Sequence, residues 1–203
     1  MMTAFGERKL REIAAAHPEE TFYCVCVYFD QTYADFILYL NVPEQAQATA
    51  EDLIARYPQL NRGLTLEEKV EKVKWNAGDF RYLFYAHEEE FWYAAWQPIR
   101  ALYDRLGSQL YDRTEDVQSK RPKSAYDRFR RRAMEAACHV AIDLERGEPL
   151  KLLKKTADFR VTCVDHDEAR EISDKCLTRA RKTYIPLPTR GWQPGCDPDD
   201  FSS

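Results

Sequence analysis

The sequence is poor in the residues from which most nucleotide and catalytic sites are built. It has only seven glycines and four histidines among 203 residues. None of the glycines forms a GxGxxG or GxxxxGK[ST] segment, so both common phosphate-binding loops are excluded. No GxSxG nucleophile elbow occurs either. We therefore expect no bound cofactor and find no complete catalytic signature.

Long apolar runs are also missing. No stretch approaches the roughly 18 apolar residues that a membrane-spanning helix needs. Charged side chains between Glu7 and Arg11 interrupt the N-terminal segment, which excludes the apolar core of a secretion signal. We expect a soluble cytoplasmic protein without a membrane partner.

An excess of positive charge is absent as well, since 30 basic residues face 34 acidic ones for a net charge of −4. Capture of nucleic acid needs clustered excess Lys and Arg. The one strongly basic stretch, 128–132 with basic residues upstream of it, includes Phe129 on the expected core side of a helix. This pattern is more typical of a solvent-exposed helix face than of a helix that binds in a groove of DNA or RNA. We therefore predict no nucleic-acid partner.

Six cysteines are present, mostly inside apolar runs: Cys24, Cys26, Cys138, Cys163, Cys176 and Cys196. Without a secretion signal, such cysteines are expected to be reduced and buried. Cys24 and Cys26 share one face of an expected strand. No second pair or nearby histidine completes a zinc set, so we assign these two a structural role and predict no metal.

The secondary-structure pattern mixes strands and helices. Two apolar runs, 22–29 and 35–40, flank a short polar stretch and predict an antiparallel hairpin, and the alternating segment 158–165 predicts a further strand. Helices are expected at 4–16, from Pro43 to about 57, from the capping box at Thr65 to about 73, at 124–146, and from about 168 to 182. The segment from Glu88 to about 112 is expected to form one long helix or two, with Pro98 as a kink or as the start of the second.

These elements predict the α+β class. We expect a small central antiparallel sheet, made of the hairpin near 21–40 plus the strand near 158–165, covered by several helices. Residues 1–183 should form a single domain, because the chain has enough apolar residues for one substantial core. Residues 184–203 should form a Pro-rich acidic tail.

Two acidic segments are candidate binding sites. The first is the run of Glu88, Glu89 and Glu90 beside Trp92. These residues could supply paired carboxylates for acid–base chemistry. The helix dipole, however, favours acidic residues in a first turn, and this structural explanation needs no chemistry. The second segment is Asp165-His166-Asp167. Because neighbours in sequence cannot all converge on a metal from a strand end, we interpret it as a strand end that leads into a helix cap.

The order of segments resembles a known family. The strands FYCVCVYFD and LYLNVPEQ, the stretch VKWNAGDFRY, the long helix and the junction FRVTCVDHDE are together similar to the bacterial domain-of-unknown-function family 4303, over about residues 5 to 183. The chain departs from the family pattern at 41–44, where it reads Asn-Val-Pro-Glu instead of Asn-Thr-Glu-Glu. It also has Asp79-Phe80 where Asp-Trp or Glu-Trp is common.

This resemblance implies a binding protein. The family has no established enzymatic activity, and its members are similar in size and style to the small acidic antidotes encoded beside bacterial toxins. We therefore expect an immunity protein that neutralises a toxin by occluding it. A basic, nuclease-like toxin would suit acidic segments such as 88–90 and 197–200. The expected partner-binding residues are Glu88, Glu89, Glu90, Trp92, Asp165, His166 and Asp167.

Two other functions stay open. An enzyme could assemble its site near the end of the sheet from Asp79, His87, Asp165 and His166. A scaffold protein could instead self-associate through exposed aromatic side chains such as Trp92 or Trp96.

Overall fold

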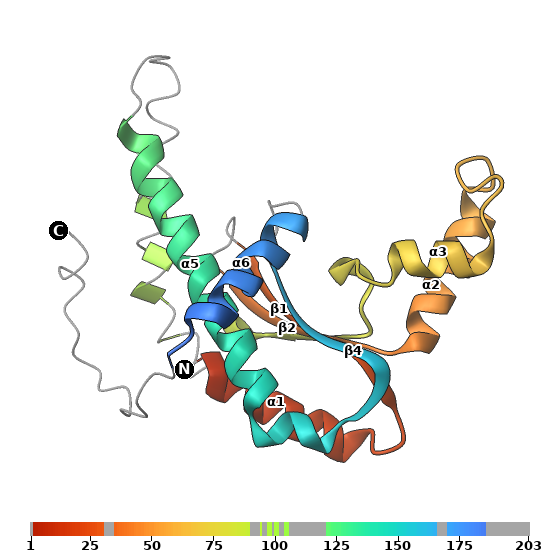
Figure 1. Cartoon of the computed structure of the whole chain (residues 1–203), viewed down its shortest axis with the longest axis horizontal. Helices are drawn as coiled ribbons and strands as arrows, with labels where there is room; N and C mark the ends of the chain where they lie inside the picture. Colours follow the sequence, from red (N-terminus) through yellow and green to blue (C-terminus); the bar gives the residue numbers. More distant parts are fainter. Residues whose placement is uncertain are drawn as a thin grey trace.

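The fold is built around a four-stranded sheet, shown in Figure 1 in a computed structural model of the whole chain. The structure describes residues 2–30, 35–89, 94, 97–98, 100–101, 104–105, 121–165 and 170–185. The strands are β1 (Thr21–Asp30), β2 (Asp35–Asn41), β3 (Tyr82–Tyr85) and β4 (Lys154–Asp165). They lie in the order β3-β2-β1-β4.

The α+β class and the hairpin of β1 and β2 are confirmed. The sheet, however, is mixed and not wholly antiparallel, because β4 runs parallel to β1. A parallel neighbour needs a crossover connection, and the long stretch between β3 and β4, which contains α5 (Arg121–Arg146), supplies it. The apolar pattern of a strand does not encode its direction, so this pairing could not be read from the sequence.

Strand β3 was not predicted. It pairs antiparallel with β2, from Ile37 opposite Tyr85 to Leu40 opposite Tyr82. Its four residues are all apolar or aromatic. A run this short shows no alternation of apolar and polar residues, so periodicity could not identify it.

Other helices include α1 (Met2–Ala16), α2 (Pro43–Arg56), α3 (Leu66–Val73) and α6 (Arg170–Thr183), with 3-10 turns η1 (Ala77–Asp79), η2 (Ala86–Glu88) and η3 (Glu148–Leu152). The predicted capping box is confirmed, since Thr65 and Glu68 cap each other's backbone N–H groups at the start of α3. The helix predicted from Glu88 to about 112 does not begin at Glu88, because η2 ends there and Glu89 is extended. Further along this segment, the described residues 94, 97–98, 100–101 and 104–105 are helical, and the rest of 90–112 lies outside the described residues.

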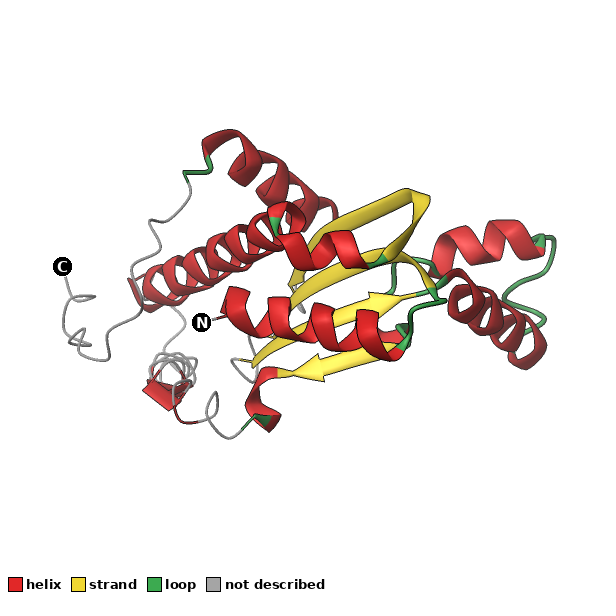
Figure 2. Ribbon diagram, turned by 90° about the horizontal axis from the view of Figure 1, so that it is seen from below, coloured by secondary structure: helices red, strands yellow, loops and turns green. Residues whose placement is uncertain are grey.

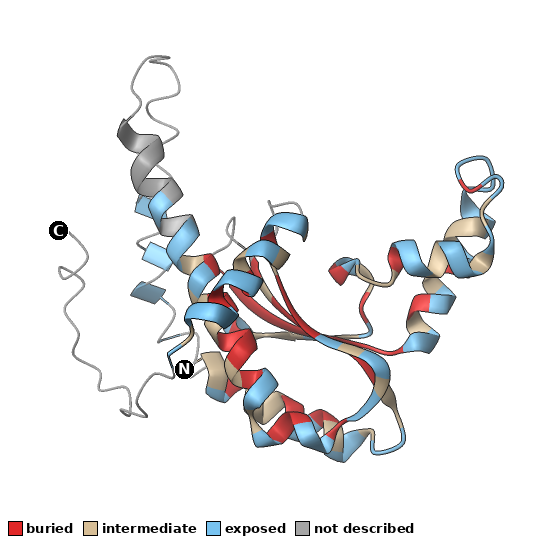
Figure 3. Ribbon diagram, viewed as in Figure 1, coloured by how far each residue is buried: buried red, intermediate tan, exposed pale blue. Residues whose placement is uncertain are grey.

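One face of the sheet carries the larger core. Helices α1, α5 and α6 contribute buried side chains to it, among them Phe5, Cys138 and Leu177, which pack with Phe22 and Val27 of β1. Figure 2 shows α1 lying across the strands, and Figure 3 shows buried residues along the strands and on the inner sides of α1 and α5. Truncating a large side chain in such a core costs about 3–5 kcal/mol, so substitutions on this face should be strongly destabilising.

The second face carries a smaller aromatic cluster. A register shift between Phe22 and Cys24 puts Tyr23 on the same side as Cys24 and Cys26. These side chains pack with Ile37 and Tyr39 of β2, Ala46 of α2, Ala77 of η1 and Phe80. The prediction that Cys24 and Cys26 share one buried face is confirmed. Burial raises the pKa of the Cys26 thiol to about 12.

Packing continues just beyond the predicted domain boundary. Tyr184 donates a hydrogen bond to Asp143 of α5, and the Arg146 guanidinium lies 4.5 Å from the centre of its ring. Tyr184 therefore belongs to the folded body, whereas residues 186–203 lie outside the described residues. Within the described ranges, no helix combines the length and apolar character needed to cross a membrane.

Candidate functional site

The predicted acidic run does not present a continuous charged surface. Glu88 is exposed, but Glu89 is half-buried against α1, where its carboxylate lies 3.1 Å from Arg8 and 2.8 Å from Lys9. The hydrogen bond from Lys9, followed by the one from Arg8, lowers the pKa of Glu89. Glu89 therefore fastens η2 to α1. Glu90 and Trp92 lie outside the described residues.

Asp165 ends β4, where the register places its backbone opposite Phe29 of β1. Its side chain, and all of His166 and Asp167, lie outside the described residues. Asp35 at the start of β2 lies at this same end of the sheet. We call this region the acidic strand end; it comprises Asp35, His87, Glu88, Glu89 and the backbone of Asp165.

A histidine and a carboxylate pair at the acidic strand end. Nδ1 of His87 lies 2.6 Å from Oδ2 of Asp35, while Oδ1 of Asp35 accepts a hydrogen bond from the Phe36 N–H. Asp35 is buried and the His87 side chain is 45% exposed. Asp79, in contrast, lies in η1 at the other end of β3, a strand roughly 13 Å long at about 3.3 Å per residue. The fold therefore separates Asp79 from His87.

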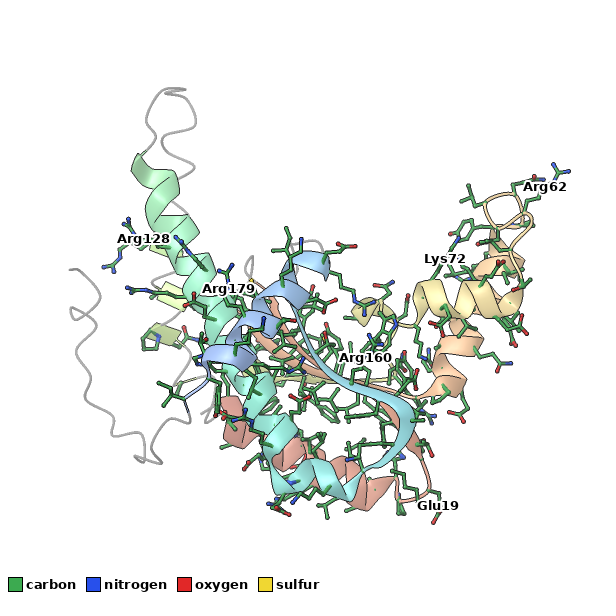
Figure 4. The ribbon with its side chains drawn as sticks, in the orientation of Figure 1. Glu19, Arg62, Lys72, Arg128, Arg160 and Arg179 are labelled. Atoms are coloured by element: carbon green, nitrogen blue, oxygen red, sulfur yellow. The ribbon has the colours of Figure 1, made fainter. Side chains whose placement is uncertain are left out.

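A second group of side chains assembles on the face of the sheet that carries the smaller cluster. The Arg160 and Arg170 guanidinium carbons lie 5.2 and 4.8 Å from the centre of the Trp75 ring system. The Lys74 ammonium lies 5.6 Å from it. Figure 4 places Arg160 on β4 between α6 and α3. With the nearby Thr162, we call this group the Trp75 cluster: Lys74, Trp75, Arg160, Thr162 and Arg170.

Buried hydrogen bonds position Trp75. The Tyr23 hydroxyl donates to the backbone carbonyl of Lys74 and accepts a hydrogen bond of 2.7 Å from the Asn41 amide. The Tyr23 ring meets Trp75 edge-on, with centres 5.5 Å apart. Burial, with smaller effects from neighbouring charges, raises the pKa of Tyr23. Because the connection after α3 is tied to β1 and β2 in this way, Trp75 is fixed before any ligand arrives.

The charges of the Trp75 cluster are unevenly balanced. Lys74 pairs with Asp158, and this contact lowers the pKa of the Asp158 carboxyl. Arg170 has a long pairing of 3.6 Å with Asp174. The Arg160 side chain makes no ion pair or hydrogen bond within the described part of the chain, and its guanidinium lies over the Trp75 ring. Each cation over an aromatic ring contributes about 0.5–1 kcal/mol at an exposed site.

Thr162 adds an unused polar group. It lies two residues after Arg160 on β4, and its Cα pairs with that of Cys26. The residue is 8% exposed, and its hydroxyl oxygen has no hydrogen-bond partner among the residues described. An unsatisfied buried hydroxyl costs about 1–3 kcal/mol.

Sequence reasoning missed this site because its residues come from three separate segments. Trp75 and Arg160 are 85 positions apart, and no motif spacing connects them. The stretches VKWNAGDFRY and FRVTCVDHDE do contain Trp75, Arg160 and Thr162, but as parts of a family resemblance and not as a site. A single arginine in a strand and a single tryptophan in a distant segment are too common to identify a site.

The described ranges contain no group of three or more His, Cys, Asp or Glu side chains that could hold a metal ion. Comparisons of the chain with protein-family models, curated proteins and solved structures return no match.

Proposed function

We propose that this chain is a bacterial binding protein of the immunity type, which neutralises a cognate toxin by occluding it. The family resemblance supports the immunity role, and the Trp75 cluster supports the more general role in binding. Trp and Arg are the residue types that carry most of the energy at protein interfaces. Here a half-buried tryptophan and two arginines are held together on one face by the fold.

The fixed geometry of the cluster favours binding. Trp75 is anchored by its edge-on contact with Tyr23, and the guanidinium groups of both arginines lie over its ring. An anchor already in its bound conformation avoids part of the entropy that an interface otherwise loses on association. A protein that acts by occlusion needs such a rigid surface and no reacting group.

The test is capture followed by reconstitution. The full chain is immobilised beside a W75A variant, and proteins from the native host that bind only the wild type are identified by mass spectrometry. The partner is then purified, and its activity is measured with increasing amounts of the wild-type chain. The proposal expects inhibition that is complete near one equivalent.

A partner that binds the chain while keeping its full activity would overturn the immunity role and leave a binding role. Recovery of no partner, together with turnover of a small-molecule substrate by the purified chain, would overturn both.

A second candidate function, an enzyme, is supported by the pair of Asp35 and His87. A buried carboxylate that orients an exposed imidazole is the arrangement found in many general bases. If the chain is a hydrolase of this kind, H87A should abolish turnover of an ester or phosphoester panel, while W75A should retain it. Equal activity of H87A and wild type would remove this candidate.

A further inference from the structure

We propose that the Trp75 cluster is a carboxylate-binding site that takes the Asp or Glu side chains of an acidic segment of a protein partner. This inference rests on the proposed binding function and assigns it a partner chemistry. It also reverses the expectation of a basic partner at the acidic strand end, where Glu89 is already paired with Arg8 and Lys9.

The first argument concerns the hydrogen-bond donors of the two arginines. A guanidinium that stacks by its face on an aromatic ring keeps its N–H donors free, because these lie in the guanidinium plane. Arg160 uses none of them within the described ranges, and Arg170 has one pairing of 3.6 Å to Asp174. Two guanidinium carbons at 5.2 and 4.8 Å from one ring centre thus bring unused donors into one small region, and a carboxylate is the group that a guanidinium binds with two parallel bonds.

The second argument is the Thr162 hydroxyl, which comes from an independent observation. It is buried, it has no partner in the described part of the chain, and it lies on the same face of β4 as Arg160. Arg170 is close enough to influence the electrostatics of both Cys24 and Cys26, and Cys26 is the strand neighbour of Thr162. Thr162 therefore adds an unpaired hydroxyl to the face of the sheet that carries Arg160, and a carboxylate drawn into this face would offer it an acceptor.

The third argument separates an acidic protein segment from a nucleic acid. The cluster is surrounded by carboxylates, since Lys74 lies near Asp158 and Glu71, and Arg170 lies near Asp174. A long phosphate chain would extend past the arginines and meet these carboxylates, whereas a short acidic segment can place one or two of its carboxylates on the arginines and end before it reaches them. The net charge of −4 also opposes a polyanion more strongly than a short acidic segment.

The experiment uses the full chain and fluorescein-labelled hexaglutamate as the probe, with binding followed by fluorescence anisotropy in about 50 mM salt. We expect hexaglutamate to bind, and the double substitution R160Q/R170Q to weaken its binding at least about tenfold, as loss of charge-assisted bonds does. T162V should weaken binding about threefold or more. Thermal melts of each variant test whether it is folded.

The matched control is R128Q/R179Q, which removes the same two charges from exposed arginines on α5 and α6. In Figure 4 both lie away from Arg160. The control should bind hexaglutamate within about twofold of the wild type, because its effect is limited to screened long-range charge.

Three results would overturn the inference. They are equal weakening by the control and the test pair, absence of hexaglutamate binding, and displacement of hexaglutamate by single-stranded oligouridylate or inorganic phosphate at lower concentration than by unlabelled hexaglutamate. None of these touches the proposed function, which is decided by capture and inhibition of the partner. Failure of that capture, with hexaglutamate binding intact, would in turn count against the proposed function alone.

Discussion

The acidic strand end and the Trp75 cluster are opposite kinds of surface. In the strand end, charges adjacent in sequence are used within the molecule: Glu89 pairs with two residues of α1, and Asp35 pairs with His87. In the Trp75 cluster, residues far apart in sequence converge, and Arg160 and Thr162 are left without polar partners in the described ranges. The acidic run in the sequence thus forms ion pairs within the molecule. The side chains without polar partners lie in segments where the sequence has no run of charged residues.

The largest expected effect comes from W75A, which removes the centre of the cluster. We expect partner binding to weaken by at least about 2 kcal/mol, as at interface hot spots, which is roughly a 30-fold rise in Kd. Titration calorimetry with the captured partner measures it. The double variant E88Q/E89Q at the strand end should change Kd by less than about fivefold. The reverse order of effects would make the strand end the binding surface.

The next effect tests whether Tyr23 positions Trp75. Y23F removes the hydroxyl that donates to the Lys74 carbonyl and accepts from the Asn41 amide, and leaves a buried donor unpaired. We expect unfolding free energy to fall by about 1–3 kcal/mol, measured by urea denaturation. Binding should also weaken, because Trp75 loses its support. Unchanged binding in Y23F, at a temperature where it is folded, would show that Trp75 does not depend on this support.

A structural feature could be predicted from the sequence when the residues that determine it lie within one segment of the chain. The hairpin, the helix at 121–146 and the capping box at Thr65 are local, because their periodicity and caps lie within one segment. The direction of β4 and the existence of β3 depend on partners that are distant in the chain.

The sites follow the same rule. Glu88 and Glu89 stood out as a run, but the sequence could not show that Arg8 and Lys9, about 80 positions earlier, neutralise one of them. The Trp75 cluster needs β4 beside β1 and the segment after α3 folded over the same face. Without the parallel pairing of β4, Arg160 has no reason to meet Trp75.

A smaller effect, of opposite sign, is expected for T162V. Valine keeps the shape of threonine and removes a hydroxyl that is buried without a partner in the described chain, so the folded protein should become more stable by about 1 kcal/mol. Urea denaturation measures this gain. Together with weaker hexaglutamate binding, it would show a group kept for a ligand at some cost to the fold. Destabilisation by T162V would mean that the hydroxyl has a partner in the folded protein.

The smallest effect belongs to Glu89 and depends on pH. Because its pKa is lowered in the folded protein by Lys9 and Arg8, its ion pairs stabilise the fold above the unfolded value of 4.5. This contribution is lost as the pH falls through the folded pKa. E89Q should therefore be less stable than wild type at pH 7 by about 0.2–1 kcal/mol, the range for partly exposed pairs, and the difference should shrink as the pH falls below 4.5.

The matched control for this measurement is E88Q, since Glu88 is exposed and makes no ion pair within the described residues. It should match the wild type at both pH values in thermal melts. If E88Q loses as much stability at pH 7 as E89Q does, the loss reflects the general charge of the strand end, and Glu89 has no special role in fastening η2 to α1. If only E89Q loses stability, the acidic run is divided between one residue that holds the fold together and one that remains available to a partner.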